Sequence, residues 1–246
     1  MSKVADVQKA LRAHIDHEPR VFKAGPGEYA EHDKFLGVTV PNTRVVAKQF
    51  KDLPLADVER LLTSEWHDER LCALFVLVNR YAKTSEANKK AIYDFYMSHI
   101  KWVNNWDLVD CSAEYVVGPY LESRPEKMQV LTKLAGSKDL WQRRVAMIAT
   151  FDYIRTKHRA DEALVIAEQL LYDQHDLIQK AVGWMLREIG KRVSREPLLT
   201  FLDQHAATMP RTTLRYAVEH LSPEQRTYHM TYKSDIHLPE QRRNKT

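Results

Sequence analysis

The sequence predicts an all-α protein, an α-solenoid of HEAT-like helical repeats whose curved stack offers a concave face. Apolar residues recur at helical spacing, as Val4, Val7, Leu11 and Ile15 do near the N-terminus. No convincing alternating strand pattern accompanies them. Prolines stand where a helix could begin, because their missing N–H costs least there, at Pro41, Pro54, Pro125, Pro197, Pro210 and Pro223. We therefore expect about twelve helices of roughly 10–19 residues joined by short links.

A repeat is the strongest support for a stacked fold. The segments HDERLCALFVLV, NNWDLVDCSAEYVV, LWQRRVAMIATF and LIQKAVGWMLRE align with Arg70, Asp107, Arg143 and Lys180 in register. The spacings between these four positions are 37, 36 and 37 residues, and PRTTLRYAVEHL follows as a slightly closer unit. A unit of this length holds two helices and is typical of a solenoid. The alternative, an irregular helical bundle with accidental spacing, is disfavoured by four units in register.

The repeats predict one domain over residues 1–232, followed by a flexible basic tail over residues 233–246 that ends in QRRNKT. One segment before the repeats departs from the helical pattern. The stretch AGPGEYAEHDKFLG contains Gly25, Gly27 and Gly37, three of only seven glycines in the chain, and predicts a structured loop.

Composition excludes several classes of protein. No apolar run approaches the roughly 20 residues that span a bilayer, and the charged N-terminus lacks a signal-peptide core. Two cysteines, Cys72 and Cys111, within helical patterns favour a reducing cytoplasm. Phosphate-loop, dinucleotide and zinc motifs are absent from the sequence, so we expect no metal and no nucleotide cofactor. The net charge of +4 is compatible with nucleic-acid binding without establishing it.

Trp184 is out of place on its predicted helix. At 100° per residue it lies about 140° from the centre of the apolar stripe. Lys180 and Arg187 are among its neighbours on that side. A tryptophan among cations is costly to leave in water, so it indicates either a partner or ligand, or a cover supplied by the next repeat. The helix alone does not decide between these two interpretations.

The helix that contains NNWDLVD carries a second unusual combination. Trp106 lies at the margin of its core side and Asp110 beside it, while Asp107 and Glu114 continue the polar face. Taken alone, Asp110 is more often a solvated carboxylate than a catalytic one. In a third segment Arg144 falls within an apolar arc, where its guanidinium needs a partner. That partner is either a neighbouring acid in a buried ion pair, or a phosphate or Asp110 in a functional site.

Taken together, these segments resemble the AlkD-type DNA alkylation repair family, the HEAT-like-repeat DNA glycosylases. The resemblance runs from about residue 20 to about residue 222 and rests on FKAGPGEYAEHDKFLGVTVPNTR, WDLVD, LWQRRVAMIATF, IQKAVGWMLREIGK and PRTTLRYAVEHL. It implies excision of cationic N3- and N7-alkylated purines, such as 3-methyladenine and 7-methylguanine, from duplex DNA. The family's two tryptophans and aspartate match Trp106, Trp184 and Asp110, and an arginine near the lesion matches Arg144. Tyr29 matches a loop residue, with a spacing that differs by one residue.

The implied chemistry suits these residue types. A purine alkylated at N3 or N7 carries a positive charge and departs as a neutral base, so a general acid is dispensable. A carboxylate such as Asp110 could then stabilise the oxocarbenium-like sugar, while the faces of Trp106 and Trp184 meet the cationic sugar and base. The resemblance also implies recognition without a base-flipping pocket. Our candidates for phosphate contacts on the concave face are Lys180, Arg187, Arg211, Arg215, Arg44 and Lys48.

Two other functions remain open at this point. Curved helical repeats commonly serve as non-catalytic scaffolds, and the fold alone does not exclude this role. A protein that binds distorted DNA without excision would keep the cations but would not need Asp110. For the glycosylase we expect a cytoplasmic, nucleoid-associated monomer whose partner is duplex DNA containing alkylated purines, with no membrane partner.

Overall fold

The computed structural model describes residues 3–16 and 22–231 and is built from helices. The predicted tail over residues 233–246 lies outside the described residues. In chain order the elements are α1 (Lys3–Arg12), α2 (Val40–Gln49), α3 (Leu55–Leu62), α4 (His67–Tyr81), α5 (Glu86–Ser98), the 3-10 helix η1 (Ile100–Trp102), α6 (Trp106–Asp110), α7 (Ala113–Leu121), α8 (Lys127–Ala135), α9 (Leu140–Ala149), α10 (Phe151–Lys157), α11 (Asp161–Leu170), α12 (Asp176–Arg192), α13 (Arg195–His205), α14 (Arg211–Ala217) and α15 (Pro223–Thr231).

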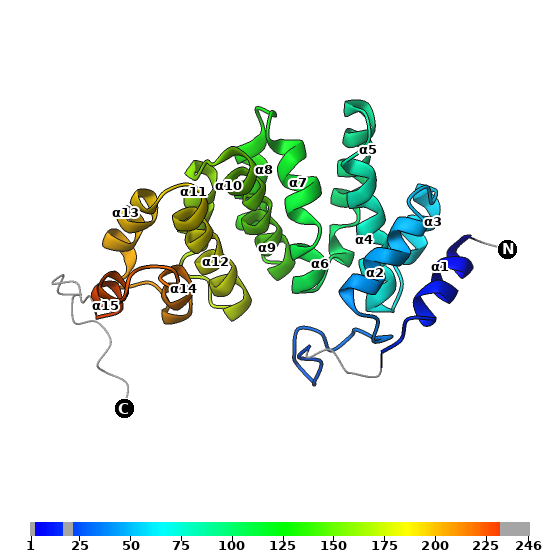
Figure 1. Cartoon of the computed structure of the whole chain (residues 1–246), viewed down its shortest axis with the longest axis horizontal. Helices are drawn as coiled ribbons and strands as arrows, with labels where there is room; N and C mark the ends of the chain where they lie inside the picture. The colour runs from blue at the N-terminus through cyan, green and yellow to red at the C-terminus, as the bar shows by residue number, and fades with distance from the viewer. Residues whose placement is uncertain (1–2, 17–21, 232–246) are drawn as a thin grey trace.

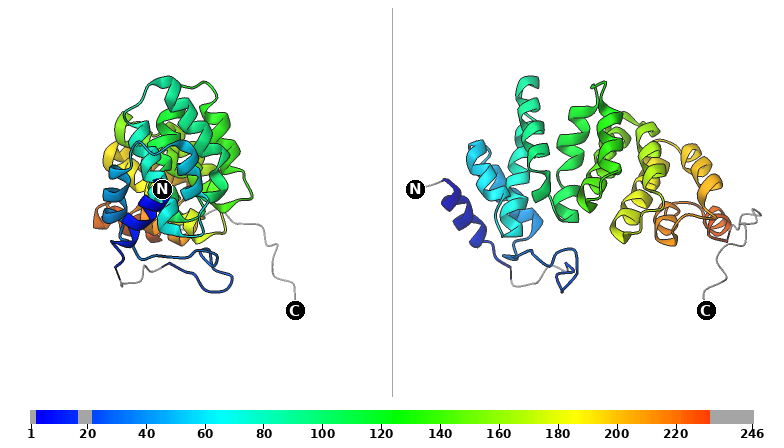
Figure 2. Two further views of the ribbon diagram at one scale, coloured as in Figure 1. Left: turned by 90° about the vertical axis from the view of Figure 1, so that its right-hand side faces the viewer. Right: turned by 180° about the vertical axis from the view of Figure 1, so that it is seen from behind.

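The helices stand side by side in one curved row, from α1 at one end to α15 at the other (Figure 1). Helices near one another in sequence pack together, as α7 does on α9 and α12 does on α14. The loop of residues 22–39 lies on the inner side of the curve, which the view from behind also shows (Figure 2). Within the described residues no strand forms, and two isolated β-bridges are the only sheet-like pairings. The predicted all-α helical-repeat fold is therefore confirmed.

A recurring side-chain contact fixes the turn in front of three inner helices. In each case a side chain near the start of the helix donates a hydrogen bond to the backbone carbonyl oxygen six residues earlier, which satisfies an acceptor in the preceding turn. The pairs are Arg70 with Ser64 (3.0 Å), Arg143 with Ser137 (3.0 Å) and Gln179 with Asp173 (2.9 Å). The position equivalent to Arg143 in the next unit is therefore Gln179, and the predicted register that placed Lys180 there is wrong by one residue.

The expected helix length of 10–19 residues is wrong at two places that matter for function. The segment from Trp106 onward breaks between α6 and α7, and the segment from Leu140 onward breaks between α9 and α10. At each break a hydroxyl donates to a carbonyl of the preceding turn, Ser112 to Leu108 (2.5 Å) and Thr150 to Met147 (2.7 Å). Such contacts compete with the helix ladder and bend helices. As a result, Asp110 is the last residue of a five-residue helix.

Gly183 allows α14 to approach α12 closely. A Cβ atom at this position would lie 2.5 Å from the carbonyl oxygen of Thr213 and 2.6 Å from Cβ of Tyr216. Any other residue would therefore push the two helices apart. Because Trp184 follows Gly183 directly, this approach brings Tyr216 into the same cavity as Trp184.

The predicted structured loop is present and is fixed to the start of α4. Asp68, which is fully buried, accepts hydrogen bonds from the backbone N–H groups of Leu36 (2.8 Å) and Val38 (2.9 Å). Between them Gly37 adopts a positive φ of 84°, which glycine tolerates without steric cost. The loop is thus held from its own C-terminal end, and its tip can reach across the inner face.

Candidate active site

One cavity on the inner side of the stack contains the three residues that the sequence singles out. It has a volume of about 330 Å³ and lies between the loop and α6, α9, α12 and α14. The structure brings Trp106, Asp110 and Trp184 together here, although 78 residues separate the first from the last. The complete lining is Lys23, Tyr29, Trp106, Asp110, Arg144, Asp176, Leu177, Lys180, Trp184, Arg187 and Tyr216.

Trp106 is held at both ends. Its backbone N–H donates to the side-chain oxygen of Asn105 (2.7 Å), which caps α6. Its indole Nε1 donates to the hydroxyl oxygen of Tyr29 (3.2 Å), which also accepts from the backbone N–H of Lys23 (3.3 Å). Tyr29 in turn meets Trp141 edge to face, with ring centroids 6.1 Å apart. The loop residue Tyr29 is therefore in the cavity, and it orients the indole of Trp106.

Asp110 and Arg144 form a bidentate ion pair. Nε of Arg144 donates to Oδ1 of Asp110 (2.8 Å) and NH2 donates to Oδ2 (2.7 Å), while NH1 donates to the carbonyl oxygen of Leu177 (2.5 Å). The side chain of Arg144 is only 6% exposed and that of Asp110 is 15% exposed. Burial raises the pKa of Asp110 above its ordinary value, and the charge and hydrogen bonds of Arg144 oppose this shift. Each of the three nitrogens of Arg144 donates one hydrogen bond, and two of these three bonds go to Asp110, so its main action in this structure is to hold Asp110.

Trp184 is half-buried and faces the cavity from α12. Its Nε1 donates to Oε1 of Glu188 (3.3 Å), and its ring lies 5.5 Å from that of Phe151. Glu188 is buried and also accepts from Arg192 (2.6 Å) and Arg187 (3.2 Å). Burial alone would raise the pKa of Glu188, but its hydrogen bonds to the two arginines lower it. Sequence patterning did not identify Glu188; a signal was available in its i, i+4 spacing from Trp184.

The six expected phosphate contacts divide into two groups. Lys180 and Arg187 line the cavity, where Lys180 pairs with Asp176 (2.8 Å) and Arg187 pairs with Glu219. The remaining four cations do not line it. Arg211 donates to the carbonyl oxygen of Met230 (3.0 Å), Arg215 is exposed on α14, Arg44 lies over the ring of Phe75 at 4.1 Å, and Lys48 is exposed on α2.

A buried polar network under the loop was not predicted from the sequence. Asp33 accepts from Arg70, from Asn105 (2.9 Å) and from Nδ1 of His67 (3.3 Å), and Nε2 of His67 lies 2.8 Å from Oδ2 of Asp107. These side chains connect the loop to α4 and α6, so they hold Tyr29 against Trp106. The sequence feature that could have indicated part of this network is Asn105, because asparagine is a preferred helix N-cap residue and directly precedes Trp106.

The expectation that Asp107 and Glu114 continue the polar face of one helix is wrong, because both residues are buried. Asp107 is 4% exposed and Glu114 is 6% exposed. Asp107 contacts His67, and Glu114 lies 3.3 Å from Nε of Arg155. The prediction treated residues 106–121 as one helix, but the chain breaks at Ser112 into α6 and α7. A single helical wheel therefore does not give the buried sides of these two helices.

His67 should make the stability of the protein depend on pH. Burial would lower its pKa, but the contacts with Asp107 and Asp33 outweigh burial and raise it. Because the folded-state pKa lies above the unfolded value of about 6.5, the stabilisation is complete below about pH 6.5 and is lost as pH rises through the folded-state pKa. We expect the free energy of unfolding, measured with urea, to fall over this window in the wild-type protein. In His67→Gln this fall should be absent, and an unchanged pH dependence would contradict the assignment.

The described residues contain no group of three or more His, Cys, Asp or Glu side chains placed to hold a metal ion. None of the helices in this part of the chain has the length and apolar character needed to cross a membrane.

Comparison with known proteins is consistent with this geometry. A family model described as "DNA alkylation repair enzyme" matches residues 7–221. A solved structure, the predicted DNA alkylation repair enzyme from Enterococcus faecalis, is similar with a TM-score of 0.63 and 17% sequence identity, covering 78% of this chain and 91% of that one. No curated protein matches the chain. Because the family model spans most of the sequence, including every residue that lines the cavity, the chain belongs to the DNA alkylation repair enzyme family.

Proposed function

We propose that the protein is a monofunctional DNA glycosylase that removes cationic N3- and N7-alkylated purines, such as 3-methyladenine and 7-methylguanine, from duplex DNA. The observation that carries this proposal is the shared cavity in which the carboxylate of Asp110 stands with two indoles, Trp106 and Trp184. The second carboxylate of the lining, Asp176, is half exposed and pairs with Lys180. A buried arginine–acid pair alone would also suit a scaffold, and it is the position of the two indoles in the same cavity that favours an enzyme.

The chemistry requires little besides a negative charge in a fixed place. The alkylated purine takes the bonding electrons of its glycosidic bond and leaves as a neutral base, and positive charge develops on the sugar. Asp110 stabilises that charge, and the lone pairs that Arg144 leaves free on its oxygens can orient the attacking water. Arg144 acts as a positioning residue, because its two hydrogen bonds fix the plane of the carboxylate.

The tryptophans supply the remaining walls. Their π faces attract a cation without requiring a hydrogen bond. Tyr29 and Glu188 hold the two indoles through their Nε1 groups, which fixes the orientation of each ring at the cavity. The cavity has a volume of about 330 Å³, at the low end for ligand pockets. Recognition without a base-flipping pocket is the part of this proposal that rests on the family resemblance.

The test of the function is direct. Purified protein is incubated with a duplex that carries a single 7-methylguanine, and released bases are separated by chromatography. We expect free 7-methylguanine and an intact strand that breaks only after alkali treatment. Retention of the base after long incubation with excess protein, together with specific binding of the duplex, would instead favour a structure-specific DNA-binding protein.

Trp184→Ala should weaken binding to a duplex that contains a cationic abasic-site analogue. A cation–π contact contributes about 0.5–2 kcal/mol, so we expect the Kd to rise by a factor of about 2 to 30. Trp184→Phe, which keeps a π face, should recover part of the loss. The measurement is fluorescence anisotropy of the labelled duplex. If the Kd of Trp184→Ala equalled that of the wild type, the indole would serve only to pack against Phe151 and the next repeat.

A further inference from the structure

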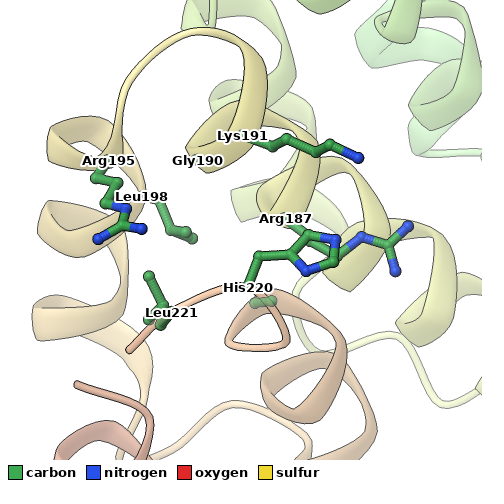
Figure 3. A pocket seen from close by; sticks show the side chains of 8 residues that line it. Arg187, Gly190, Lys191, Arg195, Leu198, His220 and Leu221 are labelled. Carbon is green, nitrogen blue, oxygen red and sulfur yellow. The ribbon is translucent and has the colours of Figure 1, made fainter. Parts of the chain in front are cut away.

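A second cavity lies beside the candidate active site, between α12, α13 and α14, and its rim is rich in positive charge. It has a volume of about 320 Å³. Arg187, Lys191, Arg195 and His220 contribute to its lining, and Leu198 and Leu221 form its apolar part. In Figure 3 Arg195 stands on one side of the two leucines, and Lys191, Arg187 and His220 stand on the other. The cavity therefore offers cations on both sides of an apolar floor.

Not all of these charges are equally available. Arg187 forms ion pairs with Glu219 and Glu188 (3.2 Å), and its hydrogen bond to Glu219 lowers the pKa of that carboxyl group, so the charge of Arg187 is largely offset. Lys191 and Arg195, by contrast, are exposed and form no ion pair with any other described residue. The surplus positive charge of this cavity therefore belongs to these two side chains.

The second cavity adjoins the first along α12. Arg187 lines both cavities, and Lys191 follows it by one helical turn. Lys180, Arg187 and Lys191 thus form a row of basic side chains about 16 Å long at 1.5 Å per residue, in which Lys180 and Arg187 pair with acids and Lys191 pairs with no described residue. Successive phosphates of one DNA strand rise by about 3.4 Å along the duplex axis, so a row of this length can follow several of them.

We infer that the second cavity binds a backbone phosphate of the same duplex, on the strand that leaves the lesion along α12. This inference rests on the proposed function and specifies how its substrate is held. Lys191 and Arg195 neutralise the phosphodiester from two sides. The apolar floor of Leu198 and Leu221 lowers the local dielectric constant, which strengthens both charge interactions and gives the adjoining deoxyribose a surface to pack on. A volume of about 320 Å³ is roughly ten times the share of one water molecule, so phosphate and sugar fit together.

The salt dependence of DNA binding tests this site. The slope of log Kobs against log[salt] for an undamaged duplex should fall in magnitude by about 0.9 for each phosphate contact that is lost. We expect Lys191→Gln/Arg195→Gln to lower it by this amount. The matched control is Lys83→Gln/Lys133→Gln, which removes the same charge from exposed lysines that line neither cavity and should leave the slope unchanged. Equal slopes for the two double variants would overturn the inference.

Two further arms identify the source of the phosphate and separate this inference from the proposed function. Inorganic phosphate is titrated into the wild-type protein and followed by the NMR signals of His220. A saturable shift at low-millimolar phosphate, with no change of slope in Lys191→Gln/Arg195→Gln, would assign the cavity to a free phosphate and overturn the DNA assignment. Because the duplex is undamaged, the slope does not depend on base release. If the protein released no 7-methylguanine, the proposed function would be wrong. The salt dependence of the two double variants would still test whether this cavity binds a phosphate.

Discussion

Asp110→Asn should almost abolish release of 7-methylguanine while DNA binding persists. Removal of one preorganised electrostatic group lowers a rate by a factor on the order of 10² to 10³, and here the group is the carboxylate that Arg144 holds with two hydrogen bonds. Asn keeps the shape of the side chain and one oxygen that accepts from Arg144, so we expect the fold to survive. The measurement is single-turnover release with enzyme in excess, alongside the Kd for an abasic-site duplex.

The matched control for this experiment is Asp161→Asn, which removes an exposed carboxylate at the start of α11. Its rate should equal that of the wild type. The pH profile provides a second readout. Since burial raises the pKa of Asp110, the acid limb of kcat/KM should lie above the ordinary value of about 3.9, with activity lost as pH falls through it. A rate for Asp110→Asn within a factor of about two of the wild-type rate would remove the carboxylate from the mechanism.

Asp33→Ala should cause the largest loss of stability. The side chain of Asp33 is 3% exposed and accepts from Arg70, His67 and Asn105. Its removal leaves NH2 of Arg70 and Nδ1 of His67 buried without this acceptor, although Arg70 keeps the carbonyl oxygen of Ser64 and His67 keeps Asp107. Breaking a buried pair in this way costs about 3–5 kcal/mol. We expect the free energy of unfolding, measured with urea by circular dichroism, to fall by this amount.

Asp52→Ala serves as the control, because Asp52 is exposed and its removal should change stability by no more than about 0.5 kcal/mol. The loop provides a local readout, since Asp33 also holds Tyr29 against Trp106. Limited proteolysis should cleave residues 22–39 faster in Asp33→Ala than in the wild-type protein. Equal cleavage rates and equal urea midpoints would show that the network does not hold the loop.

The repeat architecture was predictable because it depends on local pattern. The period that places Arg70, Asp107 and Arg143 in register depends on apolar spacing and helix length. Both of these features can be recognised from short segments of the sequence. The two helix breaks were not predictable from the same segments. At Ser112 and Thr150 the hydroxyl donates a hydrogen bond to a carbonyl oxygen of its own helix. Serine and threonine can make this bond at any helical position, and it seldom ends a helix, so their presence alone does not predict a break.

The candidate site was only partly accessible to sequence reasoning. Trp184 and Arg144 are conspicuous because each has the wrong polarity for its face of a helix, and family resemblance then joined them to Trp106 and Asp110. The Asp33–His67–Asp107 network has no such signature. Burial of Asp33 follows from where the loop docks, and this depends on residues 34 to 72 positions further along the chain.

The docked loop also determines when the cavity becomes complete during synthesis. Neighbouring helices of the stack can assemble as each emerges from the ribosome, since their contacts are close in sequence. The contacts that close the loop join Asp33 to Asn105 across 72 residues and Tyr29 to Trp106 across 77. A nascent chain can therefore dock the loop only after residue 106 has emerged, and at that stage the cavity still lacks Trp184 and Tyr216. Its two walls are made at different times, and the cavity becomes complete only when α12 and α14 join the stack.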